Sequence, residues 1–155
     1  MTTRITLIRH GETLWNATGR WQGHAPVPLH DTGIAQAKTA APHLRNAGIN
    51  HIVASDLSRA KYTAEIIAET LSLPVTTDPR WREVDLGQWQ GLFSTEIMEW
   101  DEERRRQFEA TDYVDRVFPD GEATRQHIAR TVAGLNALLV DYPDEHILVA
   151  THGGS

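Results

Sequence analysis

Two histidines of the chain each end an apolar run and are each followed by glycine. Arg9-His10-Gly11 follows a β-branched run at residues 5–8, and His152-Gly153-Gly154 follows an apolar run at residues 146–150. Each run is typical of a short buried strand. Because the carboxyl ends of parallel strands meet at one edge of a sheet, we expect the two imidazoles to share one site.

Two arginines are placed to make that site a receptor for phosphate. Arg9 adjoins His10, and Arg59 falls in the first turn of a predicted helix, outside its apolar stripe. A guanidinium binds phosphate oxygens through a planar fork and stays charged. A neutral imidazole can attack phosphorus and form a phosphohistidine, which divides one difficult step into two. The residue types therefore indicate phosphoryl transfer.

That chemistry also needs a proton donor for the leaving alkoxide and a base for the later water, and one carboxylate can serve both. Glu83 is the predicted carboxylate. Asp85 and Glu12 are its competitors, and an ion pair of Glu83 with Arg80 or Arg82 is the structural alternative.

Strands alternate with helices along the chain. Strands are predicted at residues 5–8, 51–54, 75–77 and 146–150, and helices over residues 31–47, 56–73, 94–108 and 123–142. This order indicates an α/β fold whose mostly parallel sheet is covered on both faces. The helix over residues 94–108 is so charged that it is expected to be a solvated flap.

Several side chains have predicted structural roles. Asp31 or Thr32 is expected to cap the first helix, and Ser55-Asp56 the second. The last helix is expected to pack on the core through Ile128, Val132, Leu135 and Leu139. For Trp81, Trp89 and Trp100, packing is favoured over lining a pocket. His127 and His146 are expected at the surface.

Composition bounds the function. The chain has 155 residues, 40% of them hydrophobic and 23% charged, which suits one soluble globular domain. Its net charge of −6 gives no general attraction to nucleic acid or to an anionic membrane. The absence of cysteine excludes disulfides, zinc-thiolate sites and thiol nucleophiles. The N-terminal apolar run is too short for a signal peptide or membrane span, so a cytoplasmic location is expected.

Ordered motifs across the chain resemble the signature of the histidine phosphatase superfamily, the phosphoglycerate mutase-like proteins. They are Arg9-His10-Gly11-Glu12-Thr13 with Asn16, Gly19-Arg20-Trp21-Gln22-Gly23, Ser55-Asp56-Leu57-Ser58-Arg59-Ala60, Glu83 with Gly87-Gln88-Trp89-Gln90-Gly91, Pro119-Asp120-Gly121-Glu122, and Thr151-His152-Gly153-Gly154. Arg-His-Gly alone would be a weak signal, whereas five or more blocks in order make a strong one.

The resemblance implies a three-layer αβα sandwich and a role for each matching residue. His10 would be the phosphorylated histidine and Glu83 the proton donor. The phosphoryl group would be held by Arg9, His10, Asn16, Arg59, His152 and Gly153. Gln22 and Gly23 would lie against the substrate. The family uses neither a metal nor another cofactor, and it continues past the second histidine motif, so residues 1–155 are expected to be a single domain that lacks its C-terminal elements.

Three functions compete. The favoured one is a phosphatase of the histidine type that hydrolyses a small phosphorylated metabolite and releases inorganic phosphate. A cofactor-dependent phosphoglycerate mutase is second; the segment after Glu83 resembles the phosphatase branch better. A non-catalytic module that binds a phospho-ligand or a protein is third, and the joint presence of His10, Arg59, Glu83 and His152 argues against it. The sequence leaves open whether the chain forms a homodimer.

Overall fold

A four-stranded parallel sheet forms the centre of the protein, which is described here by a computed structural model of residues 2–154. The strands are β1 (Arg4–Arg9), β2 (His51–Ala54), β3 (Val75–Thr77) and β4 (His146–Thr151), in the spatial order β1-β4-β2-β3. All three strand pairs are parallel. The expectation of a parallel sheet is therefore confirmed, and all four strands lie where the sequence predicts them.

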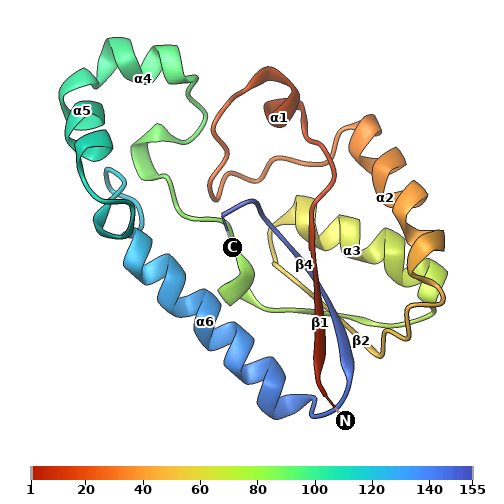
Figure 1. Ribbon diagram of the computed structural model, residues 1–155. Coiled ribbons are helices and arrows are strands. Elements are labelled where there is room, and N and C mark those ends of the chain that lie inside the picture. Colours follow the sequence, from red (N-terminus) through yellow and green to blue (C-terminus); the bar gives the residue numbers. More distant parts are fainter. Residues whose placement is uncertain (1, 155) are drawn as a thin grey trace.

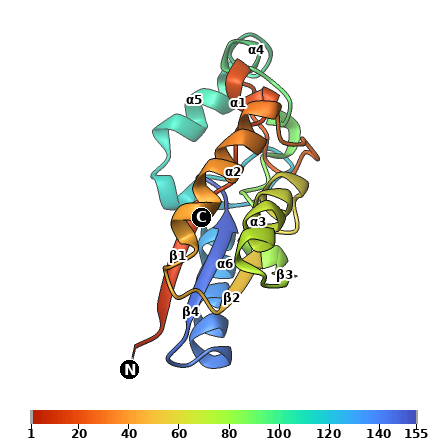
Figure 2. The same ribbon diagram turned by 90° about the vertical axis from the view of Figure 1, so that its right-hand side faces the viewer.

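Helices cover both faces of the sheet (Figures 1 and 2). Helices α2 (Asp31–Leu44) and α3 (Ser58–Leu71) pack on one face, against strand residues that include Ile52 and Leu148. Helix α6 (Thr124–Asp141) covers the other face, where Val53 and Val149 point. Successive strand residues point to opposite faces, so both faces are apolar because both are buried. This arrangement is the three-layer αβα sandwich that the resemblance implies.

The remaining helices lie beyond the carboxyl edge of the sheet (Figure 1). They are α1 (Leu14–Thr18), α4 (Ser94–Trp100) and α5 (Glu102–Ala110), with the short 3₁₀ turns η2 (Gly87–Trp89) and η3 (Tyr113–Asp115). A third 3₁₀ turn, η1 (Pro79–Trp81), packs instead against α6, and its Trp81 belongs to the buried cluster that includes Val53 and Leu138. Trp81 and Trp89 are fully buried in packing roles, as expected, whereas Trp100 is exposed.

The prediction of one helix over residues 94–108 is wrong, because the helix is interrupted at Asp101. This residue leaves helical geometry with φ −138° and ψ 35°. Its buried carboxylate accepts hydrogen bonds from the Trp89 indole at 2.8 Å and from Arg104 at 2.7 Å. Helix α4 also buries Ile97, so only α5 matches the expected solvated segment.

The predicted helix caps are also wrong. Helix α2 begins after His30, which makes no side-chain cap, and Asp31 is its first residue. Helix α3 begins after Leu57, again without a side-chain cap. Ser55 and Asp56 bond elsewhere, to His152 and Arg82 respectively. The side chains of Ser55 and Asp56 therefore hold His152 and Arg82 in place instead of capping the helix.

Helix α6 is where expected but turns a different face to the core. Ile128, Val132, Leu135 and Leu139 are each 38–47% exposed. The buried positions are Thr124, His127, Gly134 and Leu138. A Cβ at Gly134 would lie 3.2 Å from the Trp81 indole, so the missing side chain is what lets the helix approach that ring. Among residues 2–154, no helix combines the length and apolarity needed to cross a membrane.

Candidate active site

The strand register brings His10 and His152 to the same level of the sheet edge. Arg9 pairs with Thr151 across β1 and β4, so each histidine is the first residue after its strand. The amide of His10 donates to the Thr151 carbonyl at 3.0 Å. The two imidazole centroids are 5.1 Å apart and the ring planes are inclined by 59°. The predicted juxtaposition of the two imidazoles is therefore present.

His10 is held with one ring nitrogen bonded to the backbone. Its Nδ1 lies 2.7 Å from its neighbour's carbonyl, that of Gly11, so Nδ1 carries the proton and donates. The lone pair is then on Nε2, which accepts from Arg59 Nε at 3.2 Å. Burial, helped by the Arg59 and Arg9 charges, lowers the pKa of His10 to about 4. His10 is accordingly neutral at physiological pH, with its lone pair on Nε2.

Arg59 lies in the first turn of α3 and is buried, with only 1% of its surface exposed. Besides His10 Nε2, its guanidinium donates to the carbonyl oxygens of Gly23 at 2.7 Å and Ala25 at 3.0 Å. Burial lowers the pKa of Arg59 to about 10, so it stays charged at neutral pH. Among residues 2–154 no carboxylate is hydrogen-bonded to this buried cation, which suits it to an anionic ligand.

His152 is buried at 3% exposure and has one satisfied ring nitrogen. Its Nε2 lies 2.8 Å from Ser55 Oγ, and this oxygen also accepts the Leu57 amide. The Ser55 hydroxyl is then free to donate to Nε2, which places the imidazole proton on Nδ1. That Nδ1 is buried and has no hydrogen-bond partner in the part of the chain that the structure describes. An unsatisfied buried N–H costs about 1–3 kcal/mol, so it marks a position where a ligand oxygen would be stabilised.

Beside His10 lies an open cavity of about 230 Å³ lined by Arg9, His10, Glu12, Asn16 and Gln36. The Arg9 guanidinium carbon is 3.5 Å from the position that a Cβ on Gly153 would take. Arg9, unlike Arg59, is exposed.

Asn16 and Gln22 both bond to Thr13, which caps α1. Asn16 Oδ1 accepts the Thr13 amide at 3.1 Å, and Gln22 Oε1 accepts the Thr13 hydroxyl at 2.8 Å. Their amide oxygens are thereby fixed, and the NH₂ groups are the ends left to donate. Gly23, expected against the substrate, contributes its carbonyl to Arg59 instead.

Glu83 lies over the turn that follows His152. The Gly154 amide donates to Glu83 Oε2 at 3.3 Å, and a Cβ at Gly154 would overlap this carboxylate. The alternative pairing of Glu83 with Arg80 or Arg82 is not formed, because Arg80 pairs with Asp78 and Arg82 with Asp56. The structure therefore places the Glu83 carboxyl next to the second histidine motif.

Arg130, which the sequence did not single out, and His127, which was predicted at the surface, hold that arrangement from α6. Arg130 donates to the Glu83 carbonyl at 2.8 Å and to His127 Nδ1 at 2.7 Å. His127 Nε2 then donates to the Gly154 carbonyl at 2.8 Å. These bonds close a ring through Glu83 and Gly154. His127 and His146 are both buried, so their predicted surface location is wrong. The only signal in the sequence for their burial was that these two histidines are polar residues within apolar segments.

The family model of the histidine phosphatase superfamily (branch 1) matches residues 5–155 of the chain. A Yersinia pestis protein named "Probable phosphoglycerate mutase GpmB" is 38% identical over 150 residues, which are 97% of this chain and 69% of that protein.

Solved structures of phosphatases share the fold. The alpha-ribazole phosphatase from Shigella flexneri superposes with a TM-score of 0.87 at 32% identity, covering 96% of this chain and 73% of the other. A mycobacterial glucosyl-3-phosphoglycerate phosphatase, solved with VO3, gives a TM-score of 0.86 at 32% identity, covering 96% and 75%. That residues 1–155 form a single domain without its C-terminal elements stays a prediction, because these comparisons do not test it.

Proposed function

This chain belongs to the histidine phosphatase superfamily (branch 1), and from that premise we propose that it is a metal-independent phosphomonoesterase. It acts on a small phosphorylated metabolite through a phosphohistidine at His10. The observation that carries the proposal is the pair of buried imidazoles. One presents a neutral Nε2 lone pair, and the other presents a buried N–H without an acceptor, next to a buried arginine.

In the first step the Nε2 lone pair of His10 attacks phosphorus. The new N–P bond forms as the ester P–O bond breaks, and the leaving alkoxide takes a proton from the Glu83 carboxyl. Arg9, Arg59 and His152 Nδ1 hold the phosphoryl oxygens, over which negative charge spreads in the transition state. Asn16 and the Gly153 turn add neutral donors, while Gln22 and Gly23 border the substrate.

In the second step water attacks the phosphohistidine. The Glu83 carboxylate, now without its proton, accepts one from the water as the O–P bond forms and the N–P bond breaks. Inorganic phosphate leaves, and neutral His10 and protonated Glu83 are restored. One carboxyl thus serves both half-reactions, a contribution typically of about 10²–10⁴ in rate.

A phosphoglycerate mutase is the second candidate, because the Yersinia pestis relative carries that name. The two activities share the phosphohistidine and differ only in the final acceptor, which is water for the phosphatase and a sugar-acid hydroxyl for the mutase. Phosphatase neighbours at 32% identity support water as the acceptor.

The test is turnover of a panel of phosphate esters that includes 3-phosphoglycerate with and without 2,3-bisphosphoglycerate. We expect His43→Ala, a substitution at an exposed position, to release phosphate at the parent rate. We expect His10→Ala to lose phosphate release. Isomerised phosphoglycerate without phosphate release would favour the mutase. No turnover of any ester would favour a binding module.

A further inference from the structure

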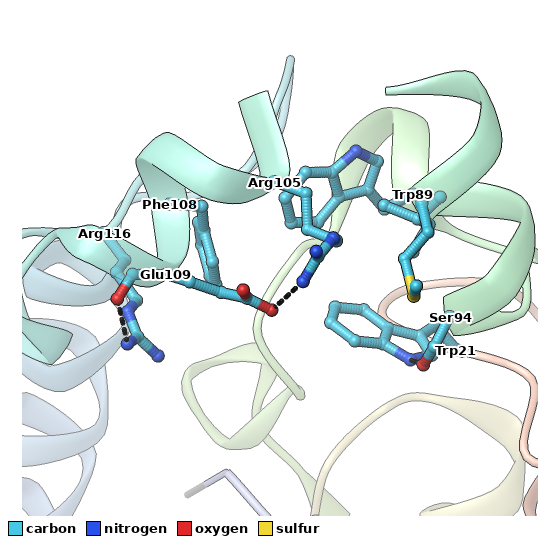
Figure 3. Close-up of a pocket in the computed structure, with 9 residues that line it drawn as sticks. Trp21, Trp89, Ser94, Arg105, Phe108, Glu109 and Arg116 are labelled. Carbon is cyan, nitrogen blue, oxygen red and sulfur yellow. Dashed lines mark hydrogen bonds and ion pairs between the residues drawn. The ribbon is translucent and has the colours of Figure 1, made fainter. Parts of the chain in front are cut away.

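A second cavity, of about 300 Å³, lies between the first loop and the helices α4 and α5 (Figure 3). Its apolar wall is made of Trp21, Trp89, Ile97, Met98 and Phe108. The Trp89 ring meets both Trp21 and Phe108 edge to face, with centroid distances of 5.9 and 5.1 Å. Such edge-to-face packing holds the rings in place and leaves a preformed apolar surface.

One cation stands at this aromatic pocket with an unused donor. The Arg105 guanidinium is bonded to Glu109 through Nη1, as Figure 3 shows. Its Nε is buried and has no hydrogen-bond partner among the described residues 2–154. A buried donor without a partner is uncommon and is stabilised when an oxygen accepts from it. The pocket therefore combines an apolar wall with a polar side made of Ser94, Arg105, Glu109 and Arg116, on which Arg105 Nε is the donor left without a partner among residues 2–154.

The segments that carry Trp21 and Trp89 also carry, or lead from, residues of the candidate active site. Trp21 stands two residues before Gly23, whose carbonyl holds Arg59. Trp89 lies in η2, in the segment that leads away from Glu83. Figure 1 shows α4 and α5 beyond the carboxyl edge of the sheet, on the same side as the ends of β1 and β4. The two segments that frame the phosphate chemistry thus also form the pocket.

We infer that the aromatic pocket binds the organic part of the ester, and that the substrate class is the phosphate of an alcohol bearing an apolar ring. An oxygen on that ring system would accept from Arg105 Nε. This inference rests on the proposed phosphatase function and adds to it the class of leaving alcohol. Compact polar esters would engage the phosphate site alone and leave the rings of the pocket uncovered.

The direct test is binding of two non-hydrolysable phosphonates to the whole chain by calorimetry. Benzylphosphonate carries an apolar ring and methylphosphonate does not. Burying a phenyl ring against Trp21, Met98 and Phe108 should make benzylphosphonate bind about 10- to 100-fold more tightly. The same preference is expected in kcat/KM for benzyl phosphate over methyl phosphate.

Two variants on α4 separate the pocket from general effects of charge. Met98→Glu places a carboxylate on the apolar wall and should reduce the affinity ratio to below about threefold. Thr95→Glu adds the same charge at an exposed position of the same helix that does not line the pocket, and it should keep the full ratio.

The outcomes distinguish the two levels of the proposal. Equal affinity for both phosphonates, or equal loss of the ratio in Met98→Glu and Thr95→Glu, would overturn the pocket while turnover of esters left the phosphatase function standing. Failure of both phosphonates to bind, together with no turnover of any ester, would remove the proposed function and the pocket with it.

Discussion

The buried cluster at the sheet edge and the helix α5 are built in opposite ways. His10, Arg59 and His152 come from distant parts of the chain and are at most 7% exposed. Backbone carbonyls fix His10 and Arg59, and the Ser55 hydroxyl fixes His152. Helix α5 buries no residue and carries pairs four residues apart, such as Arg106 with Glu102. The first construction fixes the side chains of the candidate site. The second lets the sequence around the aromatic pocket change without moving that cluster.

The largest effect on kcat is expected from removing the proposed acid, Glu83, while the rest of the cluster is kept. Glu83→Gln removes the proton donor and keeps the size of the side chain, so kcat should fall about 10²–10⁴-fold for alkyl phosphates. The loss should be smaller for 4-nitrophenyl phosphate, whose leaving group needs no proton. Steady-state phosphate release measures both.

Glu69→Gln, at an exposed position of α3, is the matched control and should keep the parent rate. An equal loss for both leaving groups in Glu83→Gln would show that Glu83 does not act as the acid.

The next effect is the pH dependence of stability that the buried histidines impose. Burial lowers the pKa of His10 to about 4 and that of His152 well below its usual range. Between pH 4 and 6.5 the unfolded chain therefore binds more protons than the folded one. The contribution of His10 is fully present above about pH 6.5, and about 3 kcal/mol is lost as the pH falls to 4.

Urea unfolding of the parent and of His10→Gln at pH 7, 5.5 and 4.5 measures this dependence. The variant should lose less free energy of unfolding on acidification, while His43→Gln should follow the parent. Identical slopes for the parent and His10→Gln would contradict the depressed pKa.

A smaller effect is expected from the α6 residue that positions Glu83. Arg130→Lys keeps the charge but cannot reach the Glu83 carbonyl, His127 and Glu122 together. Displacement of Glu83 should lower kcat about 10- to 100-fold, with KM changed less than about threefold, and should move the limb of the pH–rate profile that reports the acid.

Arg125 lies on the same helix as Arg130 and forms an exposed ion pair with Asp115. Arg125→Lys alters this pair and should leave the pH–rate profile in place. A loss of stability in Arg130→Lys without any change in the pH profile would make the role of Arg130 purely structural.

The smallest effect belongs to the exposed pairs of α5. Arg106→Ala should change the free energy of unfolding by less than about 0.5 kcal/mol, because the Arg106 side chain is 67% exposed. Thermal melts and kcat/KM for methyl phosphate provide the measurement. A large loss in either would mean that α5 is as tightly coupled to the core as the cluster is.

Local patterns predicted the parts of the fold that depend on period and position. The strands, and the position of His10 and His152 at the same level of the sheet edge, follow from apolar runs that are each followed by His-Gly. The break at Asp101 and the buried face of α6 depend on contacts with Trp89 and Trp81, which are distant in sequence.

The same division holds at the site. Arg59 was found because it lies off an apolar stripe within a motif, and Glu83 because of its motif. Arg130 was missed because a lone arginine on an amphipathic helix has the same local pattern whether it faces solvent or bonds three half-buried carbonyls.

The central claim, that His10 takes the phosphoryl group, is tested most directly by trapping the intermediate. The chain is mixed with a turned-over ester and quenched in alkali, and the phosphorylated residue is mapped by mass spectrometry. Alkali-stable, acid-labile phosphate on His10, present in His43→Ala and absent in His10→Ala, is predicted. Phosphate on another residue, or parent-rate hydrolysis by His10→Ala, would contradict the mechanism.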